Sequence, residues 1–122
     1  MPFEITWTEH EAHKRFSGQV SGKEYVQSVQ DVRSDKRFKG LKIVINDFSL
    51  ATTINIERLA MLHAASLTSA VREINPDVRV AFVVPPGEMG ADVREILAPL
   101  VVPRYKFGVF DTLEDARGWG YG

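Results

Sequence analysis

The amino-acid sequence predicts an α/β fold: one domain, residues 1–122, with a mixed, mostly parallel five-stranded sheet and about four helices in the order β-β-α-β-α-β-α-β-α. The apolar run Leu41–Ile45, rich in β-branched residues, is typical of a strand buried on both faces. After a polar stretch comes a stripe of apolar residues at helical spacing: Ile56, Ala60, Ala64, Leu67, Val71 and Ile74. A buried strand followed by a packed helix is half of a parallel β-α-β unit.

Composition limits the classes of function. The 122 residues are 44% hydrophobic and 25% charged, which is ordinary for a globular domain. The net charge of −1 gives no overall attraction to nucleic acid or to an anionic membrane. The absence of cysteine excludes disulfides and thiol chemistry. With no signal-peptide core and no apolar run of ~20 residues, we expect a cytoplasmic protein without membrane insertion.

The first two strands form a predicted hairpin. Phe3, Ile5 and Trp7 alternate with polar residues, as in a strand with one buried face. A second strand over His13–Val20 alternates less cleanly, with a turn at Glu9–Glu11 between the two. Strands so close in sequence pair antiparallel, which predicts that the first strand is the edge of the sheet.

The first helix is predicted from its N-cap. Ser21 and Glu24 have the spacing of a capping box, in which each side chain bonds the other residue's amide. The inward stripe of this helix is Tyr25, Val29 and Val32. A charged connection, 34–40, follows it, anchored by Phe38.

The second half continues the alternation of strands and helices. Asn75-Pro76-Asp77 ends the long helix, since a residue before proline is disfavoured in helix. The predicted elements are then a strand over Val78–Val84, a helix over about Gly90–Ala98, a strand over Tyr105–Phe110 and a helix capped by Thr112. Val93, Ile96 and Leu97 are the inward residues of the first of these helices, and Leu113, Ala116 and Trp119 those of the second. The strands separated by helices should be parallel with right-handed crossovers.

Three stretches resemble the STAS domain, the fold of bacterial anti-sigma-factor antagonists, and in particular its SpoIIAA-like members: DKRFKGL leading into IVINDFS, then RVAFVV, then VFDTLEDARGW. The resemblance implies a binding module rather than an enzyme. Regulated members carry a phosphorylatable serine at the start of the helix after the third strand. The ungapped match of Asp47 to that strand end places Glu57 at the serine position, which implies a module without phosphorylation switching.

The best candidate site is the predicted turn Asp47–Asn55. A helix start offers unpaired amides and a partial positive charge, which suit an anionic or carbonyl ligand. Ser49, Thr52 and Thr53 add hydroxyls, and Glu57 adds a carboxylate. In the alternative interpretation, Thr53 or Asn55 caps the helix and Asp47 bonds turn amides. The segments 86–91 and 110–112 should reach the same edge as a plain connection and a helix cap.

Other polar groups have simpler explanations. His10 and His13, with Glu9 and Glu11, are interpreted as solvated turn residues, and no metal or cofactor is expected. The basic residues Arg33, Lys36, Arg37 and Lys39 alternate with acidic ones, as in a solvated connection. Met61 and Ala65, on the polar side of the long helix, are candidates for a contact face.

Three functions follow as hypotheses. The first is a non-catalytic regulatory module that binds a protein partner or a second copy of itself through the Asp47–Asn55 turn and the following helix, including Met61. The second is a binder of a small apolar or anionic ligand at the rim formed by the carboxyl ends of the strands, beside the apolar stretch 98–103. The third, an enzyme using Asp47, Glu57 or Glu88, has only carboxylates on one edge to support it.

Overall fold

The computed structural model describes residues 3–55, 75, 77–98 and 106–122. Its elements are β1 (Phe3–Trp7), β2 (Glu11–Ser21), α1 (Gly22–Ser34), the 3-10 helix η1 (Lys36–Gly40), β3 (Ile43–Asn55), β4 (Arg79–Val83), α3 (Glu88–Leu97), β5 (Phe107–Phe110) and α4 (Leu113–Tyr121). The predicted helix with the Ile56–Ile74 stripe lies outside the described residues. Among the described helices, none is long and apolar enough to cross a bilayer.

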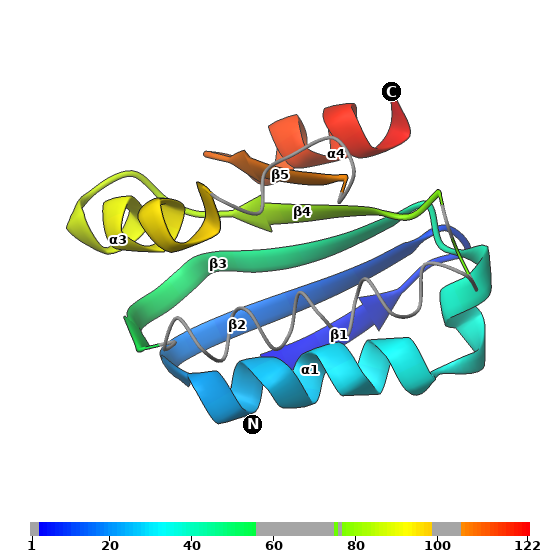
Figure 1. The fold of residues 1–122 in the computed structure, drawn as a ribbon, viewed down its shortest axis with the longest axis horizontal. Helices are drawn as coiled ribbons and strands as arrows, with labels where there is room; N and C mark the ends of the chain where they lie inside the picture. Colours follow the sequence, from blue (N-terminus) through cyan, green and yellow to red (C-terminus); the bar gives the residue numbers. More distant parts are fainter. Residues whose placement is uncertain (1–2, 56–74, 76, 99–105) are drawn as a thin grey trace.

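The five strands form one sheet in the order β1-β2-β3-β4-β5 (Figure 1). β1 pairs antiparallel with β2, and every later neighbouring pair is parallel. The predicted mixed, mostly parallel sheet with an antiparallel first strand at its edge is therefore confirmed.

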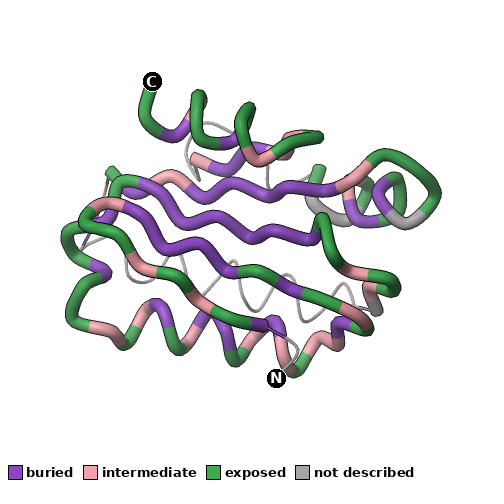
Figure 2. Tube along the Cα trace, turned by 180° about the vertical axis from the view of Figure 1, so that it is seen from behind, coloured by how far each residue is buried: buried purple, intermediate pink, exposed green. Residues whose placement is uncertain are grey.

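Successive side chains along each strand point to opposite faces of the sheet, so the hydrophobic core has two layers. On one face, Phe16 stacks on Phe48 with ring centroids 4.8 Å apart, and Tyr25 of α1 lies 5.9 Å from Phe16. On the opposite face, α4 inserts Ala116 against Ile43 and other buried residues of β3 and β4. The buried central strands lie between these layers (Figure 2).

Local capping signals are confirmed. The Glu24 amide donates to Ser21 Oγ at 3.2 Å, and the Ser21 amide donates to Glu24 Oε2 at 3.5 Å. Thr112 Oγ1 accepts from the Asp115 amide at 3.1 Å and so caps α4. These contacts join residues three apart, which is why the sequence alone was sufficient to predict them.

The predicted turn from Asp47 to Asn55 is wrong. β3 runs through it, paired with β2 from Glu11↔Ile43 to Ser21↔Asn55 with two register shifts, whereas its pairing with β4 ends at Asp47↔Val83. The polar residues that suggested a strand end are accommodated within the strand. Beyond them, Ala51 and Ile54 pack on the core next to the fully buried Phe48. These inward residues are three positions apart because each register shift with β2 inserts one extra residue into β3.

Candidate functional site

Asp47 lies on β3 and not in a turn, with 3% of its surface exposed. One carboxylate oxygen accepts from His13 Nε2 of β2 at 2.7 Å, and the other accepts from the Ser49 amide at 2.9 Å. The residue is in register with Val83 of β4, which is in turn in register with Phe110 of β5. The pairing of β4 with both β3 and β5 thus ends level with Asp47, whose carboxylate is already satisfied.

The charge state of this pair follows from two opposing effects. Burial raises the pKa of Asp47, but the hydrogen bonds from the His13 ring and from Ser49 lower it, and the net pKa is below the usual value for aspartate. The carboxylate is therefore ionised at neutral pH. The pair joins β2 to β3 as a charge-assisted hydrogen bond within the sheet.

Glu11 holds a second polar cluster on the same face of the sheet. Its carboxylate accepts from Arg117 Nε and Nη2 of α4 at 3.1 and 2.9 Å, and from the Tyr121 hydroxyl at 3.0 Å. Although burial raises its pKa, these partners bring the pKa of Glu11 below its usual value. The cluster ties the last helix to the start of β2.

The prediction that Glu11 and His13 are solvated turn residues is wrong. Both are buried, since β2 begins at Glu11 and the hairpin turn closes earlier, with the Thr8 amide donating to the Glu11 carbonyl at 2.9 Å. Glu9 is exposed and His10 half-buried, as expected nearer a turn. The partners of Glu11 and His13 lie 106 and 34 positions away, so no local pattern indicated them.

In both clusters the ionisable side chains bond one another and so connect β2 to β3 and β2 to α4. A histidine–carboxylate pair forms two of the three members of a nucleophilic triad, and the third is a hydroxyl or thiol bonded to the ring. Within the described residues, no hydroxyl hydrogen-bonds to the His13 ring. The same part of the chain holds no group of three His, Asp or Glu side chains arranged to bind a metal ion.

The remaining candidates lie where β3 runs past β4. We call residues 49–55 the β3 extension. The predicted residues Ser49, Thr52 and Thr53 are all exposed on it, together with Leu50, which is 56% exposed. Asn55 is its last residue and is in register with Ser21. Glu57, Met61 and the stretch 99–103 lie outside the described residues.

The β3 extension shares an open face with β2. Leu50 is in register with Ser17, and Thr53 with Gln19, and all four residues are exposed. By strand alternation Arg15, also exposed, joins the same face. Sequence reasoning missed Leu50 because it interpreted the segment as a turn. Strict alternation from Phe48 would have turned Leu50 inward, and it faces outward because the two register shifts with β2 each insert one extra residue into β3.

The other two segments at the predicted rim serve the fold. Gly87 has φ +124°, and a Cβ on Gly90 would lie 1.9 Å from the Pro85 carbonyl oxygen, so both positions require glycine. Arg94 of α3 donates to the Val84 carbonyl at 2.8 Å and also to Asp111. The segment 86–91 is thus a plain connection and Thr112 caps α4 as predicted, whereas Asp111 pairs with Arg94 instead of capping the helix.

Comparisons with known proteins agree with this architecture. No protein-family model matches the chain, and no curated protein sequence is significantly similar to it. Among solved structures, the chain is similar to the anti-sigma factor antagonist SpoIIAA in its unphosphorylated form, with a TM-score of 0.58. The two are 12% identical over 93% of this chain and 91% of that one. The fold is therefore SpoIIAA-like, as in STAS domains.

Proposed function

We propose that this chain is a non-catalytic, single-domain regulatory module of the cytoplasm that recognises a protein partner through the β3 extension and the adjoining face of β2. The SpoIIAA-like fold supports this because its structural neighbour is an antagonist of an anti-sigma factor. The observation that carries the proposal is the continuation of β3 beyond Asp47↔Val83, which leaves Leu50 56% exposed.

The chemistry of this surface suits a protein partner. Leu50 is an apolar contact at its centre, and the residues around it are polar: the hydroxyl residues Ser17, Ser49, Thr52 and Thr53, with Gln19 and Arg15. The short hydroxyl side chains of Ser and Thr lose less conformational entropy than long side chains when they are ordered in an interface. The extension is also held in a defined conformation, since Asp47 fixes the Ser49 amide at its start.

Two further parts of the proposal concern what the module lacks. The carboxylate of Glu57 at the serine position of the resemblance leads us to propose partner binding without phosphorylation switching. The absence of catalysis is proposed because the ionisable groups of the two clusters bond one another instead of facing a shared substrate site.

Site-specific photo-crosslinking tests the proposal. A benzoylphenylalanine residue replaces Leu50 or Thr53 in the full chain, and Asp77, whose side chain is 94% exposed at the opposite end of the sheet, is the matched control position. We expect one defined adduct from positions 50 and 53 and none from position 77. Mass spectrometry identifies the adduct as a partner or as a second copy.

The variant Leu50→Asp completes the test. Light scattering after size exclusion reports self-association, and urea denaturation checks that the variant folds. Loss of the adduct from a benzoylphenylalanine at position 53, with unfolding free energy within about 0.5 kcal/mol of wild type, supports the proposal. Identical adducts at positions 50 and 77, or an adduct unaffected by Leu50→Asp, would refute it.

A further inference from the structure

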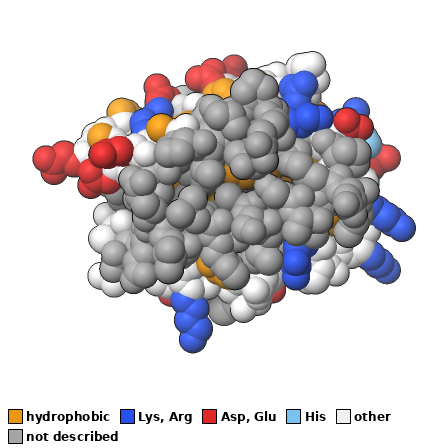
Figure 3. All heavy atoms as spheres, viewed as in Figure 1, with side chains coloured by type: hydrophobic (Ala, Val, Ile, Leu, Met, Phe, Trp, Pro, Cys, Tyr) orange, Lys and Arg blue, Asp and Glu red, His pale blue; other side chains and the backbone are white. Residues whose placement is uncertain are grey.

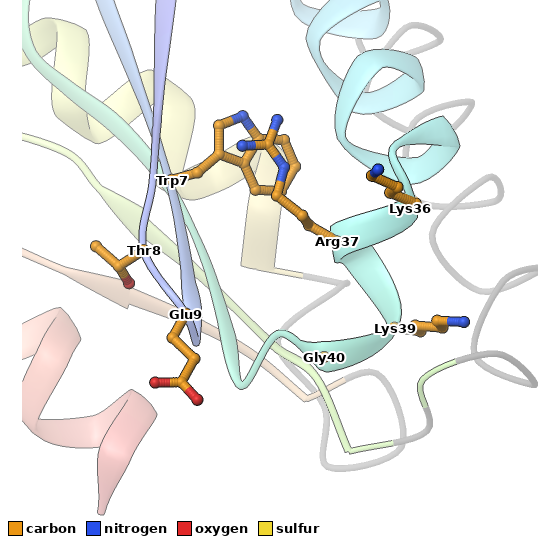
Figure 4. Close-up of a pocket in the computed structure, with 7 residues that line it drawn as sticks. All are labelled: Trp7, Thr8, Glu9, Lys36, Arg37, Lys39 and Gly40. Atoms are coloured by element: carbon orange, nitrogen blue, oxygen red, sulfur yellow. The ribbon is translucent and has the colours of Figure 1, made fainter.

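A pocket lies at the end of the sheet opposite the β3 extension. It has a volume of about 510 Å³ and is lined by Trp7, Thr8, Glu9, Lys36, Arg37, Lys39 and Gly40 (Figure 4). The walls come from the end of β1 with its turn and from η1. The sequence predicted that the connection 34–40 is solvated, whereas the structure places Arg37 of this connection over the Trp7 ring.

An arginine stacked on a tryptophan forms the centre of the pocket. The Arg37 guanidinium carbon lies 4.0 Å from the centroid of the Trp7 ring. Arg37 Nε and Nη2 each donate to Asp35 at 2.9 Å, which holds the guanidinium plane in place. Tryptophan and arginine are the residues most enriched at the energetic centres of protein interfaces. Here they are already fixed in a stacked pair.

The scaffold beneath this pair is firmly anchored. Phe38 of η1 is 5% exposed and packs in the core cluster against which Trp7 also packs. The Asn75 side-chain amide donates to the carbonyl oxygens of Phe38 and Leu41, both at 2.8 Å. A partner that binds here therefore meets a preformed surface, which lowers the entropic cost of binding.

The free charge at this end is positive. Lys36 and Lys39 are exposed, and neither forms an ion pair with a carboxylate of the described residues. Lys and Arg side chains project at the edge of the molecule where η1 lies (Figure 3). Glu9 is the one carboxylate in the lining, and the chain as a whole carries −1. The unpaired charge around this pocket is therefore positive, although the net charge of the whole chain is negative.

We propose that this pocket binds an acidic segment of a partner protein, with the Trp7–Arg37 stack as its centre and Lys36 and Lys39 as carboxylate contacts. The two lysine side chains leave η1 at separate points and do not converge on one centre (Figure 4). Spread cations suit several carboxylates along an extended chain better than a single phosphate. The inference is independent of the β3 extension, which lies at the other end of the sheet.

An NMR titration tests the inference on the full chain. The probe is an eight-residue peptide of alternating Glu and Gly, with a peptide of alternating Lys and Gly as its control. We expect saturable shifts of the Trp7 indole resonance and of the amides of residues 8–9 and 36–40, weakened by 0.5 M salt. The double variant K36E/K39E should raise the Kd about tenfold, which corresponds to about 1.4 kcal/mol for the loss of two exposed ion pairs.

Lys23 supplies the matched control, because it is an exposed lysine in the first turn of α1, at the end of that helix remote from η1. K23E should leave the Kd unchanged. Equal weakening by K23E would show a non-specific charge effect and overturn the inference, as would the absence of saturable shifts. Tighter binding of inorganic phosphate or of a single-stranded oligonucleotide under the same conditions would replace the acidic peptide as the ligand.

Discussion

Replacing Lys14 by methionine should stabilise the fold and remove a specific pH dependence. Lys14 lies on β2 with only 2% of its surface exposed, beneath α1. Its ammonium donates to Ser28 Oγ at 3.1 Å and lies 5.2 Å from the centroid of the Tyr25 ring. Burial lowers the pKa of Lys14 from 10.5 to about 7, against a smaller opposing effect of Asp31. The amine is thus half-deprotonated at neutral pH.

The magnitude of the stability change follows from the difference between the pKa of Lys14 in the unfolded chain and in the folded protein. The gap between 10.5 and about 7 corresponds to about 5 kcal/mol, at about 1.36 kcal/mol per pKa unit. Because the unfolded chain holds the proton more tightly, it binds more protons than the folded protein between pH 7 and 10.5, and stability rises with pH across this window. Between pH 7 and pH 9 the rise should be about 2 kcal/mol. Tyr25, whose pKa burial raises above 10, does not titrate in this range.

Urea denaturation followed by circular dichroism at pH 7, 8 and 9 measures the effect. Lys14→Met should be more stable than wild type at pH 7, by up to about 5 kcal/mol, and should lose the rise with pH. Ser28 keeps its own bond to the Tyr25 carbonyl at 2.6 Å, so no polar group is orphaned. Lys23→Met, at an exposed position, is the control for loss of a surface charge. A wild-type stability that is flat or falls from pH 7 to 9 would refute the reasoning.

Two further predictions concern the other side of the sheet. Asp47→Asn should destabilise the fold by about 1–3 kcal/mol by removing the charged acceptor of His13. Because folding lowers the pKa of Asp47, its contribution to stability is present above pH ~4 and is lost as the pH falls. The urea midpoint of the variant should therefore decrease less steeply at acid pH than that of wild type. Gly120→Ala should cost about 1–3 kcal/mol, since the new Cβ would lie 2.0 Å from Ile43 Cδ1, whereas Gly118→Ala, with no atom within 4 Å, should be neutral or stabilising in thermal melts.

Each of these two predictions would be contradicted by a specific result. An Asp47→Asn protein with an unchanged midpoint and acid limb would mean that the bond to His13 contributes nothing net to stability. Equal melting temperatures for Gly120→Ala and Gly118→Ala would mean that α4 moves away from the sheet without loss.

The elements that sequence reasoning predicted correctly depend on residues a few positions apart. The capping box of Ser21 and Glu24, and the cap at Thr112, are contacts within one helical turn. Periodicity likewise placed the inward residues Tyr25 and Ala116, because alternation and helical spacing are local properties. The antiparallel first strand at the edge and the parallel direction of the later strands followed from connection rules that need no side-chain detail.

The errors at Glu11 and His13 have one physical origin, which is that these polar side chains were predicted to face water. His13, Asp47 and Glu11 are buried because partners far along the chain satisfy them, and such partners cannot be read from local spacing. Lys14 was predictable in part. Strand alternation from Phe16 places it on the inward face, although nothing local indicated that α1 would supply the Ser28 hydroxyl.

The single strand β3 connects these observations. Ile43 and Ile45 lie beneath α4, Asp47 holds β2 through His13, and Leu50 lies on the exposed surface. Since the Ser49 amide donates to Asp47, this bond fixes the backbone at the point where the pairing of β3 with β4 ends. The lowered pKa of Asp47 keeps its carboxylate charged at neutral pH. A partner at the β3 extension would then bind a strand whose register is already fixed. Most of the conformational entropy of this strand is lost when the chain folds and not when the partner binds.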